Sequence, residues 1–565
     1  MKISLNLRRF FDSSRRRRKY ITKSTAEVLE VRSLLSTLVK GGISSGAISA
    51  EKEVDTWTFQ GEPGDRIELI SSTLSGASGF NAFAEVSNRF GVRIASFWTG
   101  SNTVLDLNQS GPFTVNIRDD NSQQTGTYQI GYEGLKPISP AAGKLAKGGI
   151  TAGSILTSLE KDQFTFTAKP GDRYEIITSS AARTSGFNAY TEVFAPSGTR
   201  VAQFWPLNNV ILQDFKEAGT YMVQVRDDNY SETGTYTVGL EGLKPISPTP
   251  VALVKGGIAR GSIQKSLEKD QYKFSAGIGD RYEIITTSTA NTSGFSAYAE
   301  VFAPSGTRIA AFWPGGNIIL EDFKETGVYM VQMRDSDYVD TGSYTIGLEG
   351  LKPISPNPVS LVRGGITSGS IRTALEKDQF TFSAKRGDRY EMITTSTEST
   401  AGFTAYTEVF APSGRRITGF WPNDSVVLPD LTENGIYMVQ VRDDDYTQTG
   451  AFTIGLESTK PVSPDSKPLA PLTTTSGSIG VSSEKDQWYI SVPTGKKLSI
   501  TLTETKIDSN FSAYADVYGP SGARVGGLWA GTTTLTLPSA GVYLIQVRDA
   551  RYLSRGTYKL RAWLV

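Results

Sequence analysis

Short stretches in which apolar and polar residues alternate recur along the chain. In residues 158–166, for example, Phe164 and Phe166 alternate with polar neighbours. A period of two places the apolar side chains on one face of a β-strand. Turn signals such as Lys169-Pro-Gly-Asp172 and Ala195-Pro-Ser-Gly198 separate these stretches. No stretch of the repeat has the 3.6-residue apolar period of a long helix, so the sequence predicts short strands joined by turns.

This pattern of strands and turns is written five times in succession. Two sets of markers keep a spacing of 107 or 108 residues: the tryptophans Trp98, Trp205, Trp313, Trp421 and Trp529, and the aspartates Asp55, Asp162, Asp270, Asp378 and Asp486. The period exceeds that of solenoid repeats, so each copy can hold its own core and the copies are predicted to be beads on a string. Seven to nine short strands in a hundred residues, estimated from the turn spacing, predict an antiparallel β-sandwich.

The predicted domain boundaries follow from the repeat. A basic leader occupies residues 1–39, and β-sandwich copies follow at 40–139, 147–247, 255–355, 363–463 and 473–565. The first three copies end in Gly-Leu-Lys-Pro-Ile-Ser-Pro. Paired prolines favour extended backbone, so these segments are predicted to be short semi-rigid spacers. Five such domains in line would span roughly 150–200 Å.

Composition excludes much of the common hydrolase chemistry. The chain has no cysteine and no histidine. This rules out disulfides, thiol nucleophiles and thiolate metal sites, together with Ser-His-Asp and Cys-His arrangements, HExxH zinc sites and imidazole bases. We therefore predict that the protein is not an enzyme.

The net charge of +1 hides an asymmetry. Residues 1–40 hold 11 Lys/Arg against 3 Asp/Glu, a net of +8, which leaves 47 against 54, a net of −7, for the rest of the chain. The repeats are mildly acidic and lack the basic stripe of a nucleic-acid binder, so no nucleic-acid partner is predicted. The sequence contains no transmembrane candidate.

The leader contains the basic run Arg15–Lys19, followed by the octapeptide Leu29-Glu-Val-Arg-Ser-Leu-Leu-Ser36. No apolar core follows the basic run, so this is not an ordinary secretory signal peptide. The segment resembles the LEPR-xLL leader of planctomycete-type surface proteins, with Val31 where that pattern has proline. The resemblance implies export or surface attachment, whereas the residues alone also fit a disordered basic tail.

Each repeat also resembles a known family. The second copy reads Asp162-Gln-Phe-Thr-Phe166, then Ala168-Lys-Pro-Gly-Asp172, then Gly219-Thr-Tyr-Met-Val-Gln-Val225. This order is similar to that of the bacterial pre-peptidase C-terminal domain. The resemblance implies a jelly-roll-like sandwich on secreted proteins, commonly beside a peptidase and sometimes binding calcium or substrate polymer. No peptidase domain is attached here. The predicted fold class is therefore all-β, with five tandem antiparallel jelly-roll-like β-sandwich domains joined by short Pro-containing linkers.

An acidic loop follows one strand in four of the copies. Clustered carboxylate oxygens suit calcium, which takes six to eight oxygen ligands. The alternative is an Asx-stabilised hairpin loop in which the first Asp pairs with a neighbouring Arg, because the run lacks the spacing of a dedicated calcium loop. The fifth copy has Asp549-Ala-Arg551 and should lack any metal site. The candidate calcium ligands are Asp119, Asp120, Asp227, Asp228, Asp335, Asp337, Asp443, Asp444 and Asp445.

A second acid recurs within an otherwise apolar strand, at Glu85, Glu192, Glu300, Glu408 and Asp516. A buried charge needs a partner, so we predict a structural ion pair with Arg118, Arg226, Arg334, Arg442 and Arg548 respectively. Each recurring tryptophan follows a Phe or Leu, and adjacent strand residues point to opposite faces. One member of each pair should therefore face the core. The tryptophan is either packed in the core or between domains, or an aromatic platform that binds a ligand.

These features predict a non-catalytic exported protein, secreted or on the cell surface, that is an extended structural or adhesive element of the bacterial surface or extracellular matrix. Two alternatives stay open: a multivalent polysaccharide- or protein-binding array, and an accessory subunit of a secreted peptidase. The predicted partner is a cell-envelope or matrix polysaccharide or a surface protein, and calcium is the one cofactor the residues suggest.

Overall fold

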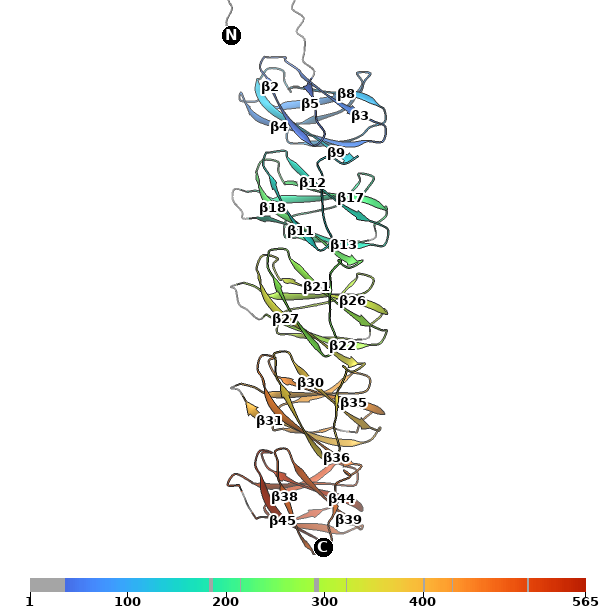
Figure 1. The fold of residues 1–565 in the computed structure, drawn as a ribbon, viewed down its shortest axis with the longest axis vertical. Coiled ribbons are helices and arrows are strands. Elements are labelled where there is room, and N and C mark those ends of the chain that lie inside the picture. The colour runs from blue at the N-terminus through green and yellow to red at the C-terminus, as the bar shows by residue number, and fades with distance from the viewer. Residues whose placement is uncertain are drawn as a thin grey trace, which may run out of the picture.

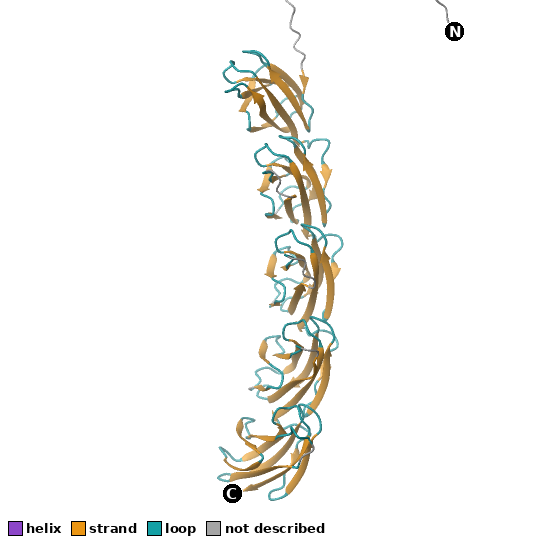
Figure 2. Cartoon of the chain, turned by 90° about the vertical axis from the view of Figure 1, so that its left-hand side faces the viewer, coloured by secondary structure: helices purple, strands orange, loops and turns teal. Residues whose placement is uncertain are grey.

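The described part of the chain is built from β-strands alone. A computed structural model describes residues 36–181, 186–213, 215–288, 294–321, 323–399, 402–428, 430–505 and 508–565, and within these ranges it contains strands β1 to β45 and no helix. The strands form ten sheets, two in each of five domains stacked along one long axis (Figures 1 and 2). Strands β1–β9 belong to domain 1, β10–β18 to domain 2, β19–β27 to domain 3, β28–β36 to domain 4 and β37–β45 to domain 5. The all-β tandem-sandwich prediction is confirmed.

Domain 2 illustrates the topology of the unit. Its five-stranded sheet has the order β10-β12-β17-β14-β15, and its four-stranded sheet has the order β11-β18-β13-β16. The strand pairs are antiparallel except for β10 with β12. The bounds are β10 Gly143–Lys144, β11 Gly149–Ile155, β12 Lys161–Ala168, β13 Arg173–Ala181, β14 Ala189–Phe194, β15 Arg200–Phe204, β16 Asn209–Gln213, β17 Gly219–Asp227 and β18 Gly234–Lys244.

The core of each domain lies between its two sheets. In domain 2, Phe166 and Val223 of the five-stranded sheet meet Ile176 and Tyr236 of the four-stranded sheet in one buried cluster. Equivalent clusters fill the other four domains. Each copy therefore holds its own core, as the period of the repeat indicated.

The domains begin earlier than the sequence suggested. Strand β10 lies in the predicted spacer after residue 139, and Leu145 belongs to the core of domain 2. In domain 1, β1 (Ser36–Thr37) pairs with β3 (Asp55–Gly61), and Leu38 is buried, although these residues were assigned to the leader. A two-residue strand has no apolar period to detect, which is why the pattern missed it. The rest of the leader, including Arg15–Lys19, lies outside the described residues.

The interpretation of the copies as beads on a string is wrong, because in domains 1 to 4 the four-stranded sheet packs on the five-stranded sheet of the next domain. Phe194 and Met222 of domain 2 form a buried cluster with Leu135 of domain 1. Clusters of the same kind join domains 2 and 3, and domains 3 and 4. The sheets thus form a continuous stack along the rod (Figure 1).

The pattern of buried and exposed residues along individual strands reflects this stacking. All six residues of β14 are buried, because one face of this strand lies on its own core and the other on domain 1. Its counterpart in domain 1, β5 (Ala82–Ser87), alternates between buried and half-buried residues. Strand β45 (Gly556–Leu564) of domain 5 also has exposed residues on its outer face. The outer faces of the two end domains therefore lack the cover that internal sheets receive.

The predicted semi-rigid spacer is a turn that hydrogen bonds hold to both neighbouring domains. In the first one, Ser139 Oγ donates to Glu133 at 2.7 Å and accepts from the Gly134 N–H at 2.9 Å. The Ser139 N–H donates to Gln163 of the next domain at 3.1 Å. Ser247 and Ser355 make the same three contacts at the next two junctions. The turn is thereby fixed to both domains that it joins.

Candidate functional site

The recurring tryptophans lie on the surface. The exposed fractions of Trp98, Trp205, Trp313, Trp421 and Trp529 are 49%, 48%, 59%, 52% and 60%. The preceding residue faces the core in each case and is buried at Phe97, Phe204, Phe420 and Leu528 and half-buried at Phe312. The predicted alternation is confirmed, and packing of the tryptophan in the core or between domains is wrong. Whether these tryptophans bind a ligand stays a prediction.

Each tryptophan is held in place by an aromatic ring of the neighbouring strand. Trp205 packs on Tyr190 of β14 with ring centroids 5.0 Å apart, and Tyr190 lies under the Arg226 guanidinium at 4.5 Å. Arg226 also covers Tyr230 at 4.3 Å. The other copies place their tryptophans on Phe83, Tyr298, Tyr406 and Tyr514 at 4.7–4.9 Å. These ring pairs are edge-to-face or tilted, and such packing fixes the orientation of the indole.

The predicted structural ion pair is present in all five copies. The arginine Nε lies 3.8 Å from the carboxylate for Arg118–Glu85, and 3.1–3.3 Å for the four pairs Arg226–Glu192, Arg334–Glu300, Arg442–Glu408 and Arg548–Asp516. A second arginine reaches the same acid in every copy, for example Arg200 at 2.5 Å from Glu192. Each carboxylate thus forms ion pairs with two arginines, which agrees with the predicted structural ion pair.

The first aspartate of each acidic loop closes that loop. Asp227 is buried and accepts the N–H groups of Asn188, Ser231 and Glu232 at 3.0–3.2 Å. Asp549 of the fifth copy accepts three loop N–H groups and that of Ser512 in the same way. The Asx-type loop is therefore present with or without the acidic run. Its predicted Arg partner is wrong in detail, because Arg226 donates to the carbonyls of Asp227 and Asp228.

Within the described ranges, one loop brings three carboxylates together. Oxygens of Asp443, Asp444 and Asp445 lie within 4.8 Å of one another. Burial and the contact with Asp445 raise the pKa of Asp443. Asp335 and Asp337 of the third copy do not form such a group. The chemistry of the Asp443–Asp445 loop fits a hard cation such as calcium, and calcium binding there stays a prediction.

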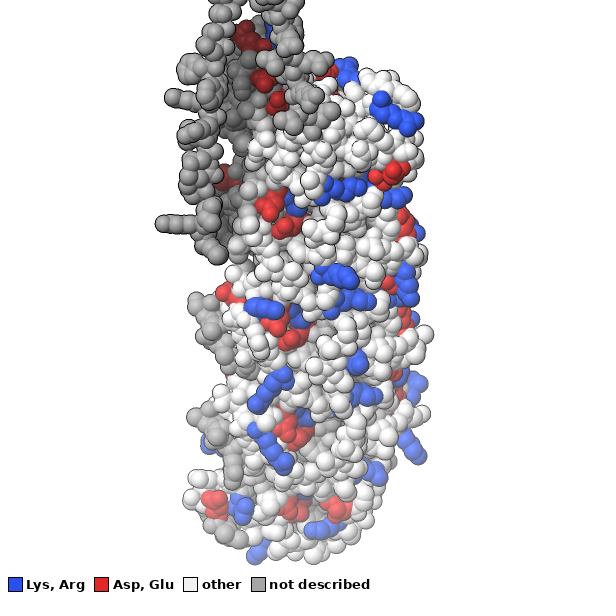
Figure 3. Space-filling model, turned by 45° about the horizontal axis from the view of Figure 1, so that its top comes forward, with Lys and Arg blue, Asp and Glu red and all other residues white. Residues whose placement is uncertain are grey.

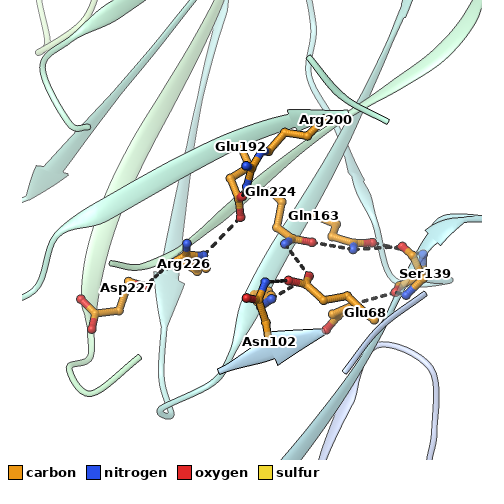
Figure 4. Close-up of polar contacts among 12 residues, drawn as sticks. Glu68, Asn102, Ser139, Gln163, Glu192, Arg200, Gln224, Arg226 and Asp227 are labelled. Carbon is orange, nitrogen blue, oxygen red and sulfur yellow. Dashed lines mark hydrogen bonds and ion pairs between the residues drawn. The ribbon is translucent and has the colours of Figure 1, made fainter. Parts of the chain in front are cut away.

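Sequence reasoning missed the most buried charges of the molecule, which lie at the domain junctions. Lys161 of domain 2 pairs with Glu68 of domain 1 at 2.7 Å, and both side chains are at most 3% exposed. Glu68 lies in β4 (Arg66–Gly76) and also accepts from Asn102 and from Gln224 of domain 2 (Figure 4). The other junctions repeat the pair as Lys269–Glu175, Lys377–Glu283 and Lys485–Glu391, at 2.5–2.7 Å.

A second carboxylate lies beside the first at each junction. Glu133, in β9 (Gly126–Lys136), is the cross-strand neighbour of Glu68. Burial raises the pKa of Glu133 to about 7. Burial also opposes ionisation of Glu68, but the Lys161 ammonium holds its pKa below the usual range. Glu241 and Glu349 have the same raised pKa as Glu133, and that of Glu457 reaches about 8.

The sequence did carry a signal for these junctions. The glutamates that pair with these lysines recur inside apolar strands, but the fifth copy has Ser499 at that position. The four lysines also recur, but the first copy has Val54. A partner that is missing once at each end of the array indicates contacts between neighbouring copies.

One face of the rod shows mixed charge. On the face seen in Figure 3, coloured Lys/Arg and Asp/Glu side chains lie close to one another and no continuous basic stripe is visible. The described part of the chain contains no helix that is long and apolar enough to cross a membrane.

Comparisons with known proteins add little to this description. No family model matches the chain, and no curated protein does. A solved structure of PliG, a periplasmic inhibitor of g-type lysozyme from Aeromonas hydrophila, matches with 20% identity over 18% of this chain and 96% of its own, at a TM-score of 0.15. The CUB1-EGF-CUB2 domain of human MASP-1/3 matches with 11% identity over 34% and 99%, at 0.11. A triple jelly-roll protein of an archaeal virus turret matches with 12% identity over 59% and 85%, at 0.12. At these TM-scores the matches carry no argument about function.

Proposed function

We propose that this protein is a non-catalytic, exported rod that acts as an extended structural or adhesive element of the bacterial cell surface or extracellular matrix. The buried ion pair that crosses each of the four junctions carries the proposal. A flexible tether needs only a linker, whereas these junctions fix each domain on the next.

The energetics of the junction favour one relative orientation of the domains. Breaking a buried pair leaves an uncompensated charge and costs about 3–5 kcal/mol. A swivel about the first junction would separate Lys161 from Glu68 and would also expose the apolar contact of Met222 with Leu135. The junction therefore resists bending, which a spacer that holds a surface at a fixed distance requires. Export is supported by the resemblance of Leu29–Ser36 to a surface-protein leader.

The rod is tested by its shape in solution. Small-angle scattering of the full chain should give the profile of an extended, gently curved rod of roughly 150–200 Å (Figure 2). The double variant Glu175→Ala/Glu283→Ala should populate bent shapes with a smaller radius of gyration. Asp106→Asn removes the partner of an ion pair in which Asp106 is 72% exposed, and it should leave the profile unchanged. A wild-type profile typical of a flexible chain would exclude the proposal.

The adhesive role needs a separate test. Labelled full-length protein should be retained by envelope or matrix fractions of the producing cells, and a matched control protein of similar charge should not be. Retention that persists after protease treatment of the fraction would favour a polysaccharide partner over a surface protein.

A second candidate function rests on the five exposed tryptophans. Successive domains have nearly the same orientation (Figure 1), so equivalent positions form a row along the rod. Weak sites in a row gain affinity for a polymer by multivalency. This array would bind a polysaccharide or a repetitive surface protein. Replacing Trp98, Trp205, Trp313, Trp421 and Trp529 together by alanine should abolish retention on that polymer, while the melting temperature changes little.

A further inference from the structure

The loop that is acidic in the first four copies is basic in the fifth. Residues 120–125 contain one acid, and the equivalent residues 228–233, 336–341 and 444–449 contain two each, with no Lys or Arg. Residues 550–555 contain Arg551 and Arg555 and no acid. The buried Asp549 still closes this loop as its counterparts do. The backbone frame is thus kept, and the charge that it presents to solvent is inverted.

The same copy has a hollow at its tryptophan. A space of about 610 Å³ is lined by Trp529, Asn510, Ser512, Arg551 and Ser554, among others. In the first two copies an asparagine, Asn81 or Asn188, donates across the equivalent position to Asp120 or Asp228 at 3.4 or 3.3 Å. Copy five has Ser512 and Ala550 at these positions and cannot form this bridge. Copy three, with Ser296 and Ser336, lacks the bridge as well, so the charge of the loop is what sets copy five apart.

The lining suits a sugar ring. Trp529 is 60% exposed, and Tyr514 holds it from one side with ring centroids 4.8 Å apart. The C–H groups on one face of a pyranose are apolar and slightly positive, so they complement the negative face of an indole. The side chains of Asn510, Ser512 and Ser554 can exchange hydrogen bonds with ring hydroxyls.

Arg551 favours a ligand that carries a negative charge. It is exposed, and no described side chain forms an ion pair or hydrogen bond with its guanidinium. A planar guanidinium binds carboxylate and sulfate groups through two parallel hydrogen bonds. The acids at the equivalent loops of the other four copies would instead repel an anion.

We infer that the hollow at Trp529 is a binding site for an acidic saccharide, a sugar ring that carries a carboxylate or sulfate within a longer polysaccharide. The inference rests on the binding role proposed for the exposed tryptophans, and it assigns charge selectivity to one copy. It makes the five sites unequal: copy five selects the charged unit, whereas the other four can contact only neutral stretches.

The test uses the full chain with two matched pairs of polymers in affinity electrophoresis. Polygalacturonate and its methyl ester differ in carboxylate charge, and dextran sulfate and dextran differ in sulfate charge. We expect binding to one or both acidic polymers that is at least about tenfold tighter than to its neutral partner. The acidic polymer that binds identifies carboxylate or sulfate as the ligand group.

Matched variants locate the site. Trp529→Ala, and the pair Ala550→Asp/Arg551→Asn that restores the loop residues of copy two, should each weaken binding about tenfold or more. Trp205→Ala should weaken binding less than Trp529→Ala does, and Asp106→Asn, at an exposed residue outside the proposed sites, should leave binding unchanged. Arg551→Asn alone changes an exposed side chain and should also weaken binding of the acidic polymer. This variant tests the site if Trp529→Ala unfolds the domain. Circular dichroism and melting curves check the fold of each variant.

Three results would overturn the inference. These are equal binding of the acidic and neutral polymers, equal loss in Trp205→Ala and Trp529→Ala, and tight binding of polyglutamate that Trp529→Ala does not affect. If the neutral polymers bind and the five-tryptophan variant loses them, the multivalent array stands and only the charge selectivity of copy five fails.

Discussion

Single charged residues decide how firmly one domain is held on the next. Lys269 and Glu175 are almost fully buried, and Gln332 also donates to Glu175 at 2.8 Å. Such a pair does not need to add net stability over an apolar pair, but it penalises every arrangement that separates its members. The specificity of the junction therefore resides in a few side chains.

We predict that Lys269→Met destabilises the junction of domains 2 and 3 by about 3–5 kcal/mol, because it leaves the Glu175 carboxylate buried without its cation. The double variant Lys269→Met/Glu175→Gln should recover most of that loss. Calorimetric unfolding of the full chain measures both. Equal destabilisation by the single and double variants would contradict the ion-pair explanation.

The acidic loops give a second prediction at this scale. Calcium should raise the melting temperature of the full chain relative to chelator, and Asp444→Asn/Asp445→Asn should remove that shift, because these carboxylates converge with Asp443. Asp228→Asn in copy two is the control and should retain the shift. No difference between calcium and chelator would exclude the hypothesis.

At the scale of elements, a strand in this molecule has two partners, its own core and the neighbouring domain. The sequence allowed the strands, their number and the Glu192–Arg226 pair to be predicted, because alternation and repetition are local or periodic signals. The junctions were not predicted. Within one copy, Glu68 and Lys161 each resemble an ordinary charged residue, and only a comparison of all five copies, in which one partner is missing at each end of the array, points to their contact. The side on which Trp205 lies was also undetermined, since alternation fixes only that it opposes Phe204.

Paired carboxylates on neighbouring strands give the junctions a pH dependence. Burial raises the pKa of Glu133 to about 7 in the folded protein, against 4.5 for an ordinary glutamate, so the folded state binds more protons between these limits. Stability should therefore fall as pH rises from about 4.5 to 7, on the order of 3 kcal/mol per such group. Glu68 has a lowered pKa, so its contribution is present above pH 4.5 and is lost as pH falls below it.

The expected result is a stability maximum in mildly acidic solution. Unfolding free energies from pH 4 to 9 would show it, and Glu349→Gln should flatten the decline between pH 4.5 and 7, because it removes one titrating carboxyl. A Glu349→Gln profile parallel to that of the wild type would mean that this group does not titrate in the folded state.

At the scale of the whole molecule, the end domains differ from the internal ones where they face outward. On the outer sheet of domain 1, Ser87 and Thr114 occupy the positions that Phe194 and Met222 hold in domain 2. The outer strand β45 of domain 5 exposes Lys559 and Arg561. Polar outer faces of this kind cap a stacked array against further association.

A chain that begins at residue 143 should lack this protection. It would expose Phe194 and Met222 and leave Lys161 without Glu68, so we expect self-association and a lower melting temperature for domain 2. Sedimentation velocity at several concentrations, compared with the full chain, measures the association. A monomer as soluble and stable as the full chain would contradict this role of the cap.

The junction also determines how an array of this type can change its length. Each internal domain carries a lysine on its first sheet and a glutamate on its last, so the interface is directional and every internal copy is complementary to the next. Duplicating or deleting one internal copy in frame would leave each remaining junction with both partners. The reach of the rod can thus vary in steps of one domain while every junction keeps its buried ion pair, and only the two end copies are fixed in place.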